Sequence, residues 1–402
     1  MELRPILSAM LRNKVGAILV GLQIAITLAV VANAVAIIMT RVEKIGRPPG
    51  IDSDNLFFVQ SYGFGPNYDQ RDTIRRDIDL IRSLPGVVSA SPINGIPLSG
   101  GGSATNLGAT AQREKQTINT NYYTVDERGM DSLGVKLLEG RNFTEAEIEF
   151  NPDPAGPQFT PFAIISKDTA IAVFGDEHAV GKTIYGAADQ AAIVIGVMDN
   201  MLGAWVGWDK LTQVMLLPRI QAGPLARYVV RTEPGRRDAL MAEVEQKLTS
   251  SNTNRAISYV RSHEQIKERS YRADSRMVAF LSVLIGLMIS VTALGIVGLA
   301  SFYVNVRRKQ IGTRRAVGAR RIDIIRYFMV ENWVLTTGGV IAGSLLAFAF
   351  GQWLSSAYSL PRLPPVYVAG GVVVLWVLGQ LAAFLPARRA AAIPPAVATR
   401  TV

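Results

Sequence analysis

Residues 304–332 read VNVRRKQIGTRRAVGARRIDIIRYFMVEN and separate two apolar runs, each long enough to cross a bilayer. Eight of these residues are Lys or Arg, whereas only Asp323 and Glu331 are acidic. Short loops rich in Lys and Arg stay on the cytoplasmic side of a membrane because these residues resist translocation. The stretch therefore predicts a multi-pass membrane protein with this loop and both termini in the cytoplasm.

The basic loop also has internal structure. Gly312 and Gly318 are expected to break it into short pieces, since glycine costs about 1 kcal/mol in a helix interior. Ile311, Arg314, Arg315 and Gly318 would lie on one short helix with an apolar face and a cationic face. Apolar residues also recur at helical spacing over 321–330. The pattern predicts a short cationic helix under the membrane, which is a suitable surface for docking a soluble partner. The competing explanation is topology alone, because basic cytoplasmic loops need no specific role.

Composition excludes several classes of protein. Hydrophobic residues make up 49% of the 402, and the absence of cysteine excludes disulfides and thiol chemistry. The two histidines, His178 and His263, lie far apart, which disfavours a histidine metal site or catalytic triad. The net charge of +10 comes from the segments placed in the cytoplasm, because residues 41–276 carry 27 basic and 29 acidic side chains. This distribution follows from topology and argues against nucleic-acid binding.

Four apolar runs predict four membrane spans, at 15–39, 277–304, 333–353 and 366–385. The first has 25 residues without a charge, about 38 Å of helix against a bilayer core of about 30 Å. A signal peptide cleaved near Ala32-Asn33-Ala34 is the alternative, and the length of the run favours a membrane span. Residues 2–14 predict an amphipathic helix lying on the inner leaflet.

The region 41–276 predicts a large α/β domain outside the cytoplasm. A strand, a helix and a strand are expected at 55–64, 69–84 and 87–93, with Asp69 as the helix cap. The same order recurs at 227–231, 236–248 and 256–260. Two such units at the two ends of the domain predict one subdomain built from both ends, with a mostly β insert between them.

The connection from this domain to the second span is expected to be helical throughout. Ser262 and Gln265 are spaced for a capping box, and no Gly or Pro follows before the span. We therefore expect one helix from 262 into the membrane, and with the first span it would form a two-helix stalk that carries motion.

Two glycine-containing stretches resemble phosphate-binding loops but lack their spacing. GDEHAVGKT at 175–183 has five residues between its glycines, whereas a P-loop has four. The Gly-rich loop at 99–103 has no following Lys and no clear helix. A turn and a surface loop are the favoured interpretations, and nucleotide binding is not expected.

The basic loop resembles the signature R-x-x-E-I-G-x-x-R-A-x-G-A of FtsX/MacB-type ABC transporter permeases, with Gln310 where that family has Glu. Residues 134–143 and 174–199 resemble segments of the MacB-like periplasmic core domain. The end of the chain resembles the family's ending in part, since Pro394 and Thr399 replace the usual Asp and Leu. The resemblance spans essentially the whole chain.

The resemblance implies an integral membrane α-helical protein with four transmembrane helices and a large extracytoplasmic α/β (α+β) domain inserted between helices 1 and 2. Its expected parts are 1–46, with the amphipathic helix and transmembrane helix 1; 47–272, the MacB-like periplasmic core domain; and 273–402, the FtsX-like permease domain with helices 2–4. The expected location is the bacterial inner membrane.

The implied function is that of an ABC transporter permease which couples ATP hydrolysis by a separate subunit to export from the periplasmic side. The chain itself would be no enzyme and would bind no cofactor, because ATP is bound by the partner. The expected partners are a cytoplasmic ABC ATPase, a second permease chain (homodimer or heterodimer), and an adaptor with an outer-membrane channel. The residues expected to dock the ATPase are Arg307, Gln310, Ile311, Gly312, Arg314, Arg315, Ala316, Gly318, Ala319 and Arg320.

Two other functions remain as alternatives at this point. A non-transporting FtsX-like regulator would activate an extracytoplasmic partner such as a cell-wall hydrolase. A membrane receptor is disfavoured because no cytoplasmic signalling domain follows the spans. The sequence does not identify the transported substrate.

Overall fold

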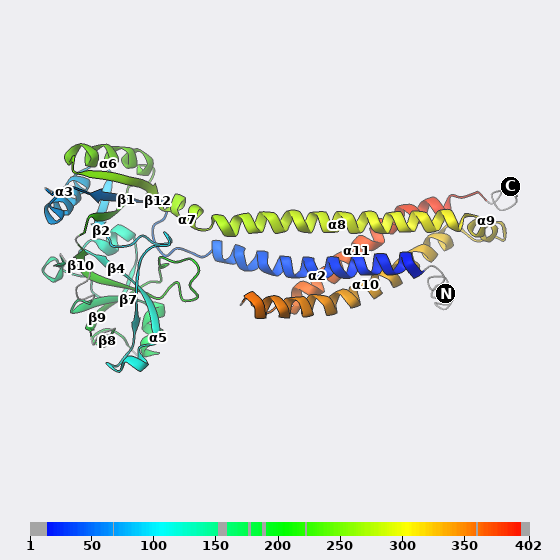
Figure 1. The fold of residues 1–402 in the computed structure, drawn as a ribbon, viewed down its shortest axis with the longest axis horizontal. Helices are drawn as coiled ribbons and strands as arrows, with labels where there is room; N and C mark the ends of the chain where they lie inside the picture. The colour runs from blue at the N-terminus through cyan, green and yellow to red at the C-terminus, as the bar shows by residue number, and fades with distance from the viewer. Residues whose placement is uncertain are drawn as a thin grey trace. The chain divides into compact units, whose positions relative to one another are not determined.

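The computed structural model of the chain describes residues 14–66, 68–151, 159–175, 178–186, 190–221, 223–358 and 361–394. The chain forms two compact units (Figure 1). Met1–Gly46 and Ala273–Val402 form the first, which we call the membrane domain, and Arg47–Arg272 forms the second, which we call the core domain. The predicted amphipathic helix, except for residue 14, and the end of the chain from residue 395 lie outside the described residues.

The membrane domain contains four helices that are long and apolar enough to cross a membrane. They are α2 (Lys14–Ile45), α8 (Arg272–Val306), α10 (Arg321–Tyr358) and α11 (Pro365–Ala391). The four predicted spans are therefore confirmed. The 32 residues of α2 and the 35 of α8 measure about 48 and 52 Å, which exceeds the bilayer core. The fourth helix does not end at Pro386 as expected, since it continues through this residue to Ala391.

Helices α2 and α8 run antiparallel (Figure 1). Side-chain contacts link them at three places along their length. The hydroxyl groups of Thr27 and Thr292 share a buried hydrogen bond of 2.8 Å. Near the ends that lead into the core domain, Arg41 pairs with Asp274. At the other end, a Cβ added to Gly16 would lie 2.7 Å from a side-chain carbon of Leu299. These side-chain contacts link the two helices, although α2 packs more closely on α10 than on α8.

Helix α10 packs closely on α2 because glycines lie in the interface. A Cβ at Gly339 would lie 2.8 Å from the Cβ of Ile24, and one at Gly343 would lie 2.9 Å from the Cα of Ala25. Small residues allow such close approach of helices in lipid. Asn33 adds a polar link, since its side-chain amide donates to the carbonyl of Ala347 at 3.1 Å.

The two ends of the core domain meet in a four-stranded sheet of order β12-β1-β11-β2, in which all pairs are antiparallel. Helices α3 and α6 cover one face, and Phe57, Val59 and Tyr228 pack against them. The predicted subdomain built from both ends is thereby confirmed. Its elements are β1 (Leu56–Gly63), α3 (Gln70–Arg82), β2 (Val87–Pro92), β11 (Leu225–Thr232), α6 (Arg237–Ser251) and β12 (Arg255–Ser262).

The insert between β2 and β11 forms a second sheet, of order β3-β4-β10-β7-β9-β5, with β6 beside β10 and β8 beside β9. The main core lies between the two sheets, where Phe58 and Val229 of the first meet Ile164 and Leu216 of the second. The other face of the second sheet packs on α5. The strands are β3 (Ser103–Leu107), β4 (Ile118–Val125), β5 (Leu137–Gly140), β6 (Glu149–Asn151), β7 (Phe162–Ser166), β8 (Thr183–Tyr185), β9 (Ala191–Met198) and β10 (Val214–Gln221), and the helices are α4 (Gly129–Leu133) and α5 (Lys167–Phe174).

The predicted helix from the core domain into the membrane is interrupted at one residue. Helix α7 (His263–Ser270) begins with the expected capping box of Ser262 and Gln265. It ends at Ser270, and α8 begins at Arg272, so the prediction of a continuous helix is wrong. Tyr271 between them is 2% exposed, and the Ser270 hydroxyl donates to the Leu98 carbonyl. The break is therefore made by tertiary contacts of the core domain, without Gly or Pro.

Candidate partner-docking site

The basic loop between α8 and α10 forms a short helix, α9 (Arg308–Ala316). Gly312 lies buried inside this helix and does not break it, contrary to expectation. Gly318 does end it, because its φ of 104° lies in the region that glycine adopts without strain. The backbone N–H of Arg320 then donates to the Asp323 carboxylate at 2.9 Å, which starts α10.

Arg307 points into the protein. Its Nη1 donates to both carboxylate oxygens of Glu331, at 3.0 and 2.9 Å, and to the Tyr327 hydroxyl at 3.2 Å. Its guanidinium also lies 5.2 Å from the ring centre of Tyr303. The side chains of Arg307 and Glu331 are only 12% and 4% exposed. Arg307 therefore ties the start of α9 to α10.

Arg315 fixes the other end of α9. Its Nη1 donates to the carbonyls of Ala391 and Ile393, at 2.8 and 2.9 Å. Carbonyl groups at a helix C-terminus lack partners within the helix, and a cation satisfies them well. Between the two arginines, Ile311 packs against the same cluster as Phe328. Three side chains thus hold α9 against α8, α10 and α11.

The remaining predicted residues face outward. Gln310, Arg314, Ala316, Gly318 and Arg320 are exposed, and Ala319 is half-buried. Val317, which was not among the predicted residues, is 85% exposed directly after α9. An apolar residue beside a glycine turn, within a basic loop, was the available signal. We call Gln310, Arg314, Ala316, Val317, Gly318 and Arg320 the docking surface.

The candidate docking surface offers groups suited to recognition of a partner. Two arginines flank an exposed apolar side chain, and the surface contains no carboxylate. Such an arrangement fits a partner that offers an apolar pocket with an acidic rim, because opposite charges steer the encounter and apolar contact stabilises the complex. Arg314 is held in place by Tyr327, whose ring centre lies 5.1 Å from the guanidinium.

The stretch 175–183, which resembles a phosphate-binding loop in sequence, forms a connection between a helix and a strand. Gly181 and Lys182 lie between α5 and β8, and Thr183 begins β8. The Lys182 ammonium is 5.2 Å from the Phe174 ring centre. Residues 176 and 177 of that stretch lie outside the described part of the chain. Within the described part, no cluster of three or more His, Asp or Glu side chains is arranged to hold a metal ion.

The four candidate spans, the inserted α/β domain and the basic helix α9 define a multi-pass membrane protein with a separate globular domain. Residues 23–247 match the MacB-like periplasmic core domain, and residues 282–395 match the FtsX-like permease C-terminal domain. The chain belongs to the MacB/FtsX-type permeases.

Curated relatives include the macrolide export ATP-binding/permease protein MacB 1/2 of Paracoccus denitrificans, 26% identical over 404 residues, covering 98% of this chain and 57% of that protein. MacB of Chromobacterium violaceum is 28% identical over 411 residues and covers 96% and 58%. The chain thus spans a little over half the length of these relatives. The periplasmic region of MacB from Actinobacillus actinomycetemcomitans is 16% identical, covers 56% of this chain and 97% of that one, and superposes with a TM-score of 0.36.

Proposed function

We propose that this chain is the permease subunit of an ABC exporter, driven by an ATPase subunit that binds the docking surface. The observation that carries the proposal is the exposed Val317, flanked by Arg314 and Arg320, at the end of helix α9, which buried contacts hold to the spans. One matched family is a permease domain and the other a periplasmic core domain, while the names of the relatives also include an ATP-binding part. The energy source would therefore lie in a separate domain or subunit.

The basic loop supports a cytoplasmic location for this surface, with both termini on the same side of an inner membrane. Movement of a bound ATPase would displace α9. Because Arg307 and Arg315 connect α9 to α10 and α11, this displacement would be passed to the spans. Helices α2 and α8, which connect by sequence to the core domain, would carry it outward as a pair.

The other partners follow from the same proposal. Because ABC ATPases act as pairs, a second permease chain, identical or related, would be needed to bind the second ATPase. Export across two membranes would also need an adaptor and an outer-membrane channel. The substrate would enter from the side of the core domain. ATP would bind only to the partner, so this chain would need no cofactor of its own.

Affinity purification of the tagged chain from its host, with gentle extraction, tests this function. We expect an ABC ATPase to co-purify with the wild-type chain. Arg314→Glu combined with Val317→Asp should abolish co-purification, because it replaces a cation and an apolar contact with negative charges. Arg315 is unsuitable for this test, since its removal would free the end of α11.

Arg388→Glu is the matched control, because Arg388 is an exposed arginine near the end of α11 and outside the docking surface. It should leave the ATPase bound. Retention of the ATPase by the double variant, with an unchanged thermal transition, would show that the docking surface is wrongly assigned. Absence of any ATPase with the wild-type chain would contradict the exporter proposal.

A further inference from the structure

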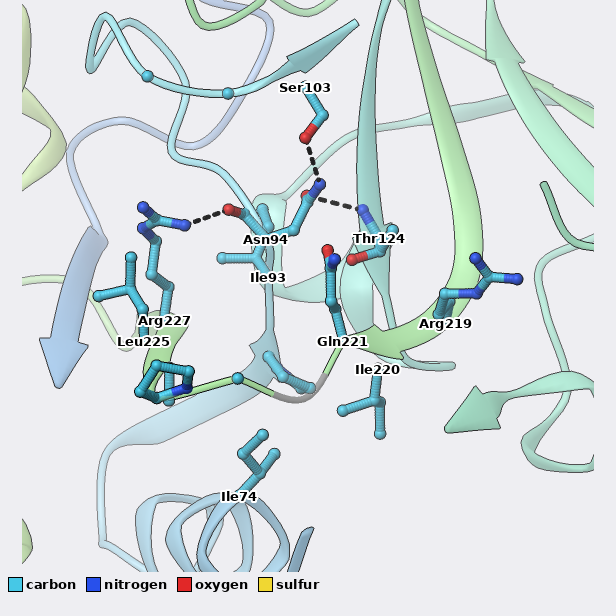
Figure 2. A pocket seen from close by; sticks show the side chains of 16 residues that line it. Ile74, Ile93, Asn94, Ser103, Thr124, Arg219, Ile220, Gln221, Leu225 and Arg227 are labelled. Carbon is cyan, nitrogen blue, oxygen red and sulfur yellow. Dashed lines mark hydrogen bonds between the residues drawn. The ribbon is translucent and has the colours of Figure 1, made fainter. Parts of the chain in front are cut away.

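The core domain contains a cavity of about 360 Å³ at the junction of its two sheets (Figure 2). The chain crosses between the sheets twice at this place, from β2 to β3 and from β10 to β11. Residues of both crossings line the cavity, among them Asn94, Gly101 and Leu225. Cavities that bind small molecules commonly begin at about this volume and often lie where two structural parts meet.

Among the described residues that line this cavity, Arg227 is a charged group without an ion-pair partner. Its Nε donates to the Gln60 side chain at 3.0 Å, and its Nη1 donates to the Asn94 carbonyl (Figure 2). Among the described residues, no carboxylate forms an ion pair with Arg227. Burial lowers the pKa of Arg227, because a charge removed from water without a partner is unfavourable. An anion in the cavity would relieve this cost.

Two further arginines, Arg261 of β12 and Arg269 of α7, lie near the same tyrosine as Arg227. Gln60 lies between Arg227 and Tyr259 in the first sheet, and Arg261 stacks over the Tyr259 ring at 4.4 Å. The charges of Arg227, Arg261 and Arg269 all lower the pKa of Tyr259, although burial raises it more. None of these three arginines forms an ion pair within the described part of the chain. Arg227 therefore lies near further cations that also have no ion-pair partner within the described residues, a setting that favours an anionic ligand.

The rest of the cavity is suited to a small molecule with an apolar body. Ile93, Ile220 and Leu225 supply apolar wall, while Thr124 and Gln221 add hydrogen-bonding groups near Asn94 (Figure 2). The other arginine of the lining, Arg219, is paired with Glu149 at 2.9 Å. A guanidinium has five N–H donors in a planar fork, which matches a carboxylate.

We propose that this cavity binds a small organic carboxylate, with its carboxylate group paired to Arg227 and its apolar body against Ile93 and Leu225. The site is independent of the docking surface, because it lies entirely within the core domain. The core domain would thus recognise an anionic ligand by itself, without ATPase binding.

Fluorine NMR on the full chain in lipid nanodiscs tests the site, with empty nanodiscs as the blank. The probe is para-fluorobenzoate, and its neutral analogue para-fluorobenzamide has nearly the same shape. We expect saturable broadening of the benzoate signal and binding of the benzamide that is weaker by at least about tenfold, since only the carboxylate pairs with Arg227. Added salt should weaken benzoate binding.

Arg227→Gln should reduce benzoate affinity by at least about tenfold and leave benzamide binding unchanged. Arg75→Gln, an exposed arginine beside the lining residue Ile74, is the matched control and should change neither. Gly101→Leu provides a second variant that keeps Arg227, because a Cβ there meets no atom within 4 Å and the larger side chain narrows the cavity. It should weaken binding of both probes.

Three results would overturn the assignment. The first is no saturable broadening by the wild-type chain, and the second is equal binding of the benzoate and the benzamide. The third is unchanged benzoate binding in Arg227→Gln. If Arg227→Gln does not fold, the selectivity of the wild-type chain and the effect of Gly101→Leu still decide the question.

Discussion

Replacing Arg255 with Met should destabilise the core domain more than any exposed substitution. The Arg255 side chain is fully buried and pairs with Asp77, whose side chain is 3% exposed. It also donates to the Leu248 carbonyl and the Ser251 hydroxyl at the end of α6. Tyr228 donates its hydroxyl to the same Asp77 carboxylate at 2.6 Å. These contacts join α3, α6, β11 and β12.

The magnitude follows from this burial. After Arg255→Met, Asp77 remains buried as a carboxylate with Tyr228 as its donor, which costs about 3–5 kcal/mol of the free energy of unfolding. For a domain of the size of residues 47–272, this lowers the melting temperature by roughly 6–20 °C. Arg76→Met is the control, because Arg76 forms an exposed pair with Asp72 at 3.4 Å and should cost about 0.5 kcal/mol or less.

The pH dependence gives a second signature. Burial raises the pKa of Asp77 above its ordinary value, while Tyr228 and Arg255 lower it. A carboxyl whose pKa is raised on folding contributes stability at low pH and loses it as pH rises through the folded pKa. Loss of Arg255 raises this pKa further. The deficit of Arg255→Met relative to wild type should therefore be larger at about pH 7.5 than at about pH 5.

Urea denaturation of residues 47–272, followed by circular dichroism, measures these free energies. The double variant Asp77→Leu, Arg255→Met removes both charges and should be more stable than Arg255→Met alone. A buried ion pair as the source of stability is refuted if Arg255→Met lowers the free energy of unfolding by less than about 1 kcal/mol. It is also refuted if the loss of free energy relative to wild type does not depend on pH. Additive effects of the two single variants would equally contradict a coupled pair.

Two further predictions concern burial and helix packing. Burial lowers the pKa of His263 from its ordinary value of 6.5 to about 4. As the pH falls from 6.5 to about 4, the unfolded chain therefore binds a proton at this histidine that the folded core domain does not bind. The core domain should lose about 3 kcal/mol over this interval, and His263→Gln should remove that slope in urea titrations at several pH values. Gly343→Leu should separate α2 from α10 and lower the thermal stability of the purified full chain, because a Cβ there would lie 2.9 Å from the Ala25 backbone. Gly338→Leu, where a Cβ meets no atom within 4 Å, should have little effect, and equal losses in both variants would exclude the packing explanation.

The sequence by itself predicted the membrane spans and the division of the core domain. Span prediction works because the bilayer requires a long apolar helix whatever surrounds it. The split subdomain was readable because the strand, helix and strand order occurs at both ends of the domain. The Asp69 cap and the capping box of Ser262 were also predicted, since these hydrogen bonds are local to a helix start.

The break at Tyr271 and the orientation of the loop arginines required the tertiary structure. Tyr271 interrupts the helix because its side chain is buried in the core domain, a contact that no local pattern records. Arg314 and Arg315 are neighbours in the sequence, but they project about 100° apart around α9. The C-terminus of α11 lies next to only one of them, so Arg315 satisfies its carbonyls while Arg314 stays exposed.

The candidate sites show the same division. The sequence alone predicted a basic helix between the second and third spans, because runs of apolar residues and clusters of basic residues are visible in consecutive residues. Which residues it presents, Val317 above all, depends on what packs against α9. The cavity beside Arg227 exists only because two crossings far apart in the chain meet between the sheets. Helix propensity and the length of an apolar run depend on consecutive residues, so the sequence alone predicts them. Which charged group pairs with a given side chain depends on residues that only folding brings together.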